Sequence, residues 1–173
     1  MIKSSDSVQI RILVAVIAVI AGLLGYGYYS QYVNYLDPCP LCMTQRFFYY
    51  MIAICAFIAL LFHWLKRGRL MRTLSYCLML VGGAGGMVTA GRQIWLQHLP
   101  PDKVPECGLG LAYWLENEPW LKTLGLLFKG DGNCAEVKWQ FLGFSMGEWS
   151  FAWFVVLTLT TVYLLIRSRR VLA

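Results

Sequence analysis

Four long apolar stretches constrain this chain more than any other feature of its sequence. They cover about residues 10–29, 47–65, 74–95 and 149–166. Each is close to the ~20 residues that a helix needs to cross the hydrocarbon core of a bilayer. Because lipid offers no hydrogen-bond partner to an exposed backbone, such stretches are expected to be helical. The sequence therefore predicts an all-α membrane protein: an antiparallel four-helix transmembrane bundle that forms a single domain over residues 1–173.

The composition and the first stretch fit this class. Charged residues make up only 14% of the chain, whereas soluble domains have about 25%. Lys3 and Arg11 accompany the first stretch, as in a cleaved signal peptide. However, the stretch is long and ends in tyrosines, such as Tyr28 and Tyr29, rather than in a small-residue cleavage site. We therefore expect a retained helix with aromatic residues at the membrane interface.

Basic residues predict the orientation of the bundle. Nine of the 15 lie at the two termini and between the second and third stretches: Lys3, Arg11, Lys66, Arg67, Arg69, Arg72, Arg167, Arg169 and Arg170. An excess of Lys and Arg marks the cytoplasmic side, so both termini are predicted to be cytoplasmic. Eight of the nine acidic residues fall on the other side, and Asp6 is the exception. The net charge of +6 is thus a signal of topology rather than of nucleic-acid binding.

Two outer segments remain, at about residues 30–46 and 97–148. The longer segment is rich in proline and glycine up to Gly110. Residues 119–128 can then form a short amphipathic helix, with Pro119 in its first turn. That helix is too short to span, so we expect it to lie on the outer membrane surface. An ordinary loop helix packed on protein is the alternative.

Cysteines are distributed between these regions. Cys55 and Cys77 fall inside apolar stretches and are expected to be small buried apolar residues. The other four lie in the outer segments, in a compartment that permits disulfides: Cys39, Cys42, Cys107 and Cys134. A C-x-x-C pair such as Cys39/Cys42 has three interpretations, namely half of a zinc site, a redox pair or a structural bridge.

Local features favour redox activity. Pro38 and Pro40 flank Cys39 and restrict its backbone, and Cys42 falls near a helix N-terminus that favours a thiolate. A zinc site made by all four outer cysteines would need a compatible spacing, but the other two are 27 residues apart and form no second C-x-x-C.

Arg46 and His98 are further candidates. Arg46 follows Cys42 by one helical turn, where a guanidinium can stabilise a thiolate or bind a quinone oxygen; an arginine that snorkels to lipid headgroups is the alternative. His98, at the outer end of the third stretch, could exchange protons with a reduced acceptor. In the same stretch, Gly82–Gly86 is expected to allow close helix packing.

Together these residues resemble the disulfide bond formation protein B (DsbB) family of bacterial inner-membrane proteins. The matching segments, in chain order, are Pro38–Cys42 with Arg46, Gly91–His98, Cys107, Cys134–Glu136, Trp139 and Phe141–Gly143. The ordered set is specific and covers nearly the whole chain. One departure is Gly147, where the family often has proline.

The resemblance implies a quinone-dependent protein disulfide oxidoreductase. Such a protein reoxidises a periplasmic thioredoxin-like thiol oxidase of the DsbA type and passes the electrons to ubiquinone or menaquinone in the membrane. Cys107 would be attacked by the partner's thiolate, and Cys134 would be its disulfide partner. Cys134 would then engage Cys39. Cys42 would be released as a thiolate that faces the quinone.

The resemblance also implies that Arg46, and with it His98, lies beside the quinone. Two other functions are alternatives. A protein that exports reductant would need cysteines on a path through the membrane, for which Cys55 and Cys77 are the candidates. A non-catalytic membrane protein would use disulfides or zinc to staple its outer loop.

Overall fold

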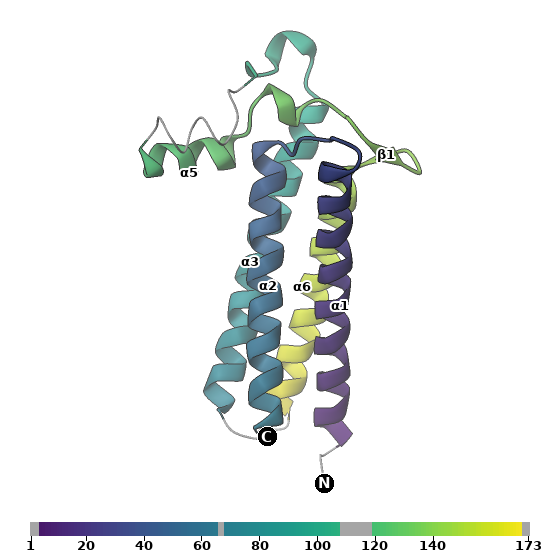
Figure 1. Cartoon of the computed structure of the whole chain (residues 1–173). Helices are drawn as coiled ribbons and strands as arrows, with labels where there is room; N and C mark the ends of the chain where they lie inside the picture. The colour runs from purple at the N-terminus through teal and green to yellow at the C-terminus, as the bar shows by residue number, and fades with distance from the viewer. Residues whose placement is uncertain (1–3, 66–67, 108–118, 171–173) are drawn as a thin grey trace.

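The computed structural model describes residues 4–65, 68–107 and 119–170. Its main body is a bundle of four long helices (Figure 1): α1 (Ser4–Tyr32), α2 (Pro40–Trp64), α3 (Arg69–Gln97) and α6 (Met146–Arg170). At 1.5 Å per residue the helices are roughly 37–44 Å long, which exceeds the ~30 Å hydrocarbon core. All four are long and apolar enough to cross a membrane. The predicted all-α transmembrane bundle is confirmed.

Glycines on α3 allow its close contact with two neighbouring helices. α3 packs against both α2 and α6, and α1 packs against α2. A Cβ on Gly82 would lie 2.8 Å from the Met51 side chain of α2, and a Cβ on Gly86 would overlap the Phe154 ring of α6. The predicted packing role of the glycine-rich segment is therefore confirmed.

All four helices begin before their apolar stretches, and all but α2 end beyond them. α2 starts about two turns before residue 47, because Pro40 occupies its first turn and Cys39 is its N-cap. α6 starts about one turn before residue 149. There Ser145 and Glu148 form a capping box: the Ser145 N–H donates to Glu148 Oε2 (2.6 Å), and the Glu148 N–H donates to Ser145 Oγ (3.3 Å).

α5 (Trp120–Lys129) projects to one side of the bundle near its outer end (Figure 1). It follows Pro119, whose carbonyl accepts the Thr123 N–H at 3.0 Å. The Thr44 hydroxyl of α2 donates to the Leu127 carbonyl at 3.3 Å, which fastens α5 to the bundle. Its Trp120 side chain is 70% exposed. The predicted short helix is confirmed, and its place at the membrane surface stays a prediction.

Four further short elements lie in the described part of the outer segment: η1 (Pro101–Lys103), η2 (Gly132–Cys134) and the strands β1 (Gln140–Phe141) and β2 (Phe144–Ser145), which form a hairpin. The strands are antiparallel. They are joined by Leu142 and Gly143, which both have positive φ (54° and 83°), as a two-residue type I′ turn requires. The Trp149 indole donates to the Phe141 carbonyl at 3.1 Å, so the hairpin is fixed to the start of α6.

Candidate functional site

Cys39 and Cys42 lie in contact at the outer end of α2. Their sulfurs are 3.0 Å apart as free thiols, and the Cys42 N–H points to Cys39 Sγ at 3.4 Å. The geometry follows from the local sequence, because Cys39 is the N-cap and Pro40 begins the first turn. Cys39 is buried and Cys42 is partly exposed. Only a local movement separates this pair from a disulfide.

Cys134 joins this pair from the outer segment. It is fully buried, in a small apolar cluster with Cys39, Leu41 and Leu96. Hydrogen bonding with Cys134 is the main cause that raises the pKa of the Cys39 thiol, followed by hydrogen bonding with Cys42 and by burial. Cys39 is therefore held protonated in the reduced protein, between two other sulfur atoms.

Cys107 approaches Gly132, two residues before Cys134, and is exposed to solvent. The Gly132 N–H donates to the Glu106 carbonyl at 3.1 Å, which holds the Cys107 segment against η2. A Cβ on Gly132 would lie 3.1 Å from Cys107 Sγ and 2.5 Å from the Pro105 carbonyl oxygen. Glycine at this position thus permits the close approach. All four outer cysteines gather at one end of the bundle.

Gln93 of α3 contacts the Cys42 sulfur directly. Its Nε2 donates to Cys42 Sγ at 3.4 Å, and its Oε1 accepts from Gln45 Nε2 at 2.8 Å. Gln45 therefore fixes which way the Gln93 amide points. Sequence reasoning did not single out Gln93. The available signal was an amide inside an apolar helix, which needs a polar partner in the membrane.

Arg46 is held by α1. Its guanidinium donates to Gln31 Oε1 (2.6 Å) and to the Gly27 carbonyl (3.0 Å), and it lies 4.7 Å from the centre of the Tyr28 ring. It nevertheless lines the same pocket as Cys42. Arg46 thus connects α1 to α2 at the site, and it is not directed only toward lipid headgroups.

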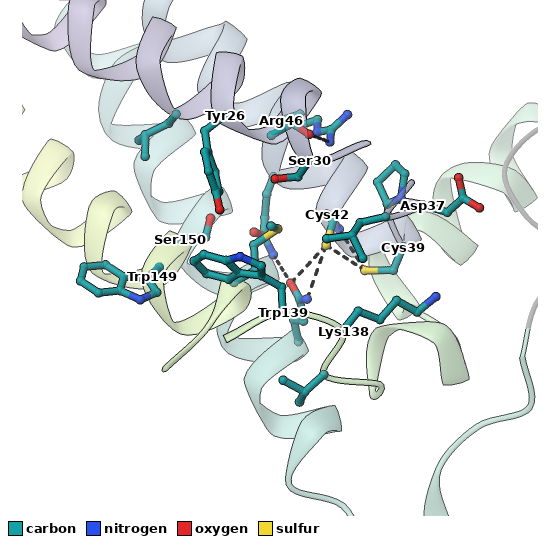
Figure 2. Close-up of a pocket in the computed structure, with 18 of the residues that line it drawn as sticks. Tyr26, Ser30, Asp37, Cys39, Cys42, Arg46, Lys138, Trp139, Trp149 and Ser150 are labelled. Carbon is teal, nitrogen blue, oxygen red and sulfur yellow. Dashed lines mark hydrogen bonds between the residues drawn. The ribbon is translucent and has the colours of Figure 1, made fainter. Parts of the chain in front are cut away.

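The pocket beside Cys42 has a volume of about 310 Å³, within the range of small-molecule sites. Aromatic side chains such as Tyr26, Trp139 and Trp149 form much of its wall (Figure 2). Tyr26 and Trp139 meet edge to face, with ring centres 5.7 Å apart. A flat apolar ring with polar atoms at its edge fits this pocket. The aromatic side chains can pack against the ring, and Cys42 and Gln93 supply polar contacts at one side of the pocket.

His98 lies outside this pocket. It is exposed at the end of α3, and its Nδ1 donates to the Ile94 carbonyl at 2.8 Å. The α3 residues that line the pocket are Gln93 and Gln97, which are one turn apart. The structure therefore does not bring His98 to Cys42, and its predicted role gains no support from the geometry.

Comparison with known proteins gives the same family over most of the chain. The family model described as "Disulfide bond formation protein DsbB" matches residues 9–164. A protein named disulfide bond formation protein B from Psychrobacter arcticus is 42% identical over 134 residues, which cover 78% of this chain and 75% of that protein. Proteins of the same name from Marinobacter nauticus and Saccharophagus degradans are 41% and 43% identical, over 76% and 74% of this chain and 77% and 75% of theirs. With its four membrane-spanning helices, this chain belongs to the DsbB family of membrane disulfide bond formation proteins.

Proposed function

We propose that this protein is a thiol:quinone oxidoreductase that reoxidises a periplasmic dithiol oxidase of the DsbA type. One observation carries the proposal: Cys39 contacts Cys42 and is buried in one cluster with Cys134, and Cys42 opens onto an aromatic pocket. Such a series of sulfurs supports stepwise thiol–disulfide exchange from an exposed cysteine to a membrane-level site.

The first exchange takes place at Cys107. The partner's thiolate attacks Cys107 Sγ of a Cys107–Cys134 disulfide, so a mixed disulfide forms and Cys134 leaves as a thiolate. The partner's second thiol then attacks the mixed disulfide. The partner is released oxidised, and Cys107 and Cys134 are left as a dithiol. The exposure of Cys107 supports this role, because an attacking protein must reach the sulfur along the disulfide axis.

The second exchange moves the electrons inward. Cys134 attacks Cys39 of a Cys39–Cys42 disulfide, and Cys42 leaves as a thiolate beside Gln93. Cys107 then attacks the Cys134–Cys39 bond, which restores the Cys107–Cys134 disulfide and leaves Cys39 and Cys42 reduced. The burial of Cys134 against Cys39 supports this order.

A quinone bound in the pocket would take two electrons and two protons from the Cys39/Cys42 dithiol. Residues that fit this group are Gln93, which donates a hydrogen bond at the Cys42 sulfur, Arg46, and the aromatic wall. Gln45 orients Gln93, and the indole rings of Trp139 and Trp149 line the same pocket. The wall suits either ubiquinone or menaquinone.

Purified protein in detergent, mixed with a reduced DsbA-type partner and a short-chain ubiquinone, tests the proposal. We expect loss of quinone absorbance in step with loss of partner thiols, and no loss with Cys107→Ser. Turnover by the Cys107→Ser variant would remove Cys107 from the relay. Stoichiometric zinc without quinone reduction would instead favour the stapling alternative. Cys55 is buried in the bundle core, as expected, but the expectation for Cys77 is wrong, because it lies on an exposed face of α3. Neither cysteine lines the pocket, so neither supports export of reductant.

A further inference from the structure

Ser30, near the outer end of α1, has a buried hydroxyl without a hydrogen-bond partner. The residue is 2% exposed and lines the pocket beside Cys42. Among the residues that the structure describes, its Oγ is the one buried hydroxyl that lacks a partner. Since an unpaired buried polar group is costly, such a group in a pocket wall needs an explanation.

Hydroxyls elsewhere in the bundle show how this cost is normally avoided. Ser75 donates to the Met71 carbonyl one turn earlier at 2.8 Å, and Thr161 donates to the Leu157 carbonyl at 2.7 Å. This back-bonding is the usual solution for Ser and Thr in helices. Ser30 does not use it, so its hydrogen-bonding capacity remains available within the pocket.

Neighbouring polar groups of the pocket are already engaged. Arg46 donates to α1, Gln45 donates to Gln93, and the Tyr49 hydroxyl contacts Ser150 Oγ at 3.1 Å. None of these contacts involves the Ser30 hydroxyl. Ser30 also belongs to α1, whereas Cys42 and Gln93 belong to α2 and α3. It therefore offers a polar contact from a different wall of the pocket (Figure 2).

We propose that the Ser30 hydroxyl donates a hydrogen bond to a carbonyl oxygen of a quinone bound in this pocket. The inference rests on the proposed function and adds a binding residue on α1. A quinone carbonyl only accepts hydrogen bonds, so the serine O–H is the donor. After reduction the same oxygen carries a proton and becomes a hydroxyl group. The serine oxygen then accepts a hydrogen bond from this O–H. A serine hydroxyl rotates to serve in both roles, so one side chain can hold the acceptor before and after electron transfer.

The test is equilibrium binding of a short-chain ubiquinone to the oxidised full-length protein in detergent, followed by tryptophan fluorescence. Ser30→Ala should weaken binding about five- to tenfold, the usual effect of one lost hydrogen bond. Ser30→Thr keeps the hydroxyl and should bind as the wild type does. Ser75→Ala, the same substitution at a buried hydroxyl with its own partner, is the matched control and should leave affinity unchanged.

Two further measurements separate a hydrogen bond from a change in packing. In infrared spectra of quinone labelled with ¹³C at the carbonyls, Ser30→Ala should raise one carbonyl stretching frequency and Ser30→Thr should not. The melting temperature of quinone-free Ser30→Ala should be unchanged or higher, because an unpaired hydroxyl is removed. Wild-type affinity in Ser30→Ala, or weaker binding with unchanged carbonyl bands, would overturn the hydrogen bond. Failure of the wild type to bind quinone would overturn the proposed function and this inference with it.

Discussion

At the scale of single residues, the four cysteines of the site differ in their exposure and in their neighbours. Cys107 is in solvent, Cys39 and Cys134 are buried, and Cys42 faces a pocket. Arg46 connects the pocket to α1 through two hydrogen bonds. Two predictions concern these side chains.

We expect Arg46→Ala to weaken quinone use about tenfold or more, because hydrogen bonds to charged groups contribute about 1.5–3 kcal/mol each. Arg46→Lys should recover only part of the loss, since one ammonium lacks the planar fork that reaches both Gln31 and the Gly27 carbonyl. The measurement is the rate of quinone reduction against quinone concentration. An unchanged apparent affinity in Arg46→Ala would show that the arginine is only an anchor.

Reduced Cys39 should resist alkylation at alkaline pH. Its raised pKa means that the thiolate appears only at a higher pH than for an ordinary thiol, which ionises near pH 8.5. Cys134→Ala removes the main cause of the shift, so Cys39 labelling should move to lower pH. Mass spectrometry of protein alkylated between about pH 7 and 10 gives both profiles. Identical profiles for Cys39 in the two proteins would contradict the assigned cause.

At the scale of elements, η2 brings the two halves of the relay together. Gly132 contacts the Cys107 segment, and Cys134 ends the same turn against Cys39. A substitution that displaces this turn should therefore move Cys107 away from Cys134 and Cys39. The Cys39/Cys42 pair should stay intact.

Gly132→Ala provides this displacement. The added methyl would meet the Pro105 carbonyl and Cys107 Sγ, and overpacking of this kind costs roughly 1–3 kcal/mol. We expect formation of the Cys107–Cys134 disulfide to slow by about tenfold, with quinone binding unchanged. Gly125→Ala on α5 is the control, because no atom lies within 4 Å of its added methyl. Equal rates of disulfide formation in the two variants would rule out a role for Gly132.

The elements also show how far sequence reasoning reaches. The lengths of the apolar stretches predict the four helices, because a helix must be long and apolar enough to cross the membrane. They do not predict where the helices begin and end. The capping box of Ser145 and Glu148 is polar, so it falls outside the apolar stretch that it extends. The two-residue strands β1 and β2 are too short for an alternating pattern to be visible.

Prediction of the site is limited for another reason. The C-x-x-C pattern identifies Cys39 and Cys42, which are close in sequence. The roles of Cys107 and Cys134 come from the resemblance to the DsbB family. The contact of Gln93 with Cys42 joins residues 51 positions apart, and no local pattern encodes it. Residue type instead indicates His98, because histidine is the residue that titrates near neutral pH.

At the scale of the whole molecule, the distribution of charge predicts a single orientation. Asp6, the acidic exception on the basic side, lies 3.9 Å from Arg72, so its charge is compensated there. Reporter fusions after Lys66 and after Lys103 test the orientation. We expect cytoplasmic activity from the first and periplasmic activity from the second. A periplasmic signal after Lys66 would reverse the topology and place the four cysteines in a reducing compartment.

Burial of Cys134 and Cys39 has a consequence for small-molecule thiols. Exchange requires a thiolate to approach a disulfide sulfur in line, and in the proposed Cys107–Cys134 disulfide the exposed sulfur is that of Cys107, whereas Cys134 is buried. Cys39 and Cys134, which are buried, are thereby shielded from direct attack. A small thiol must therefore enter at the same exposed sulfur that we propose for the protein partner, and the two would compete for Cys107.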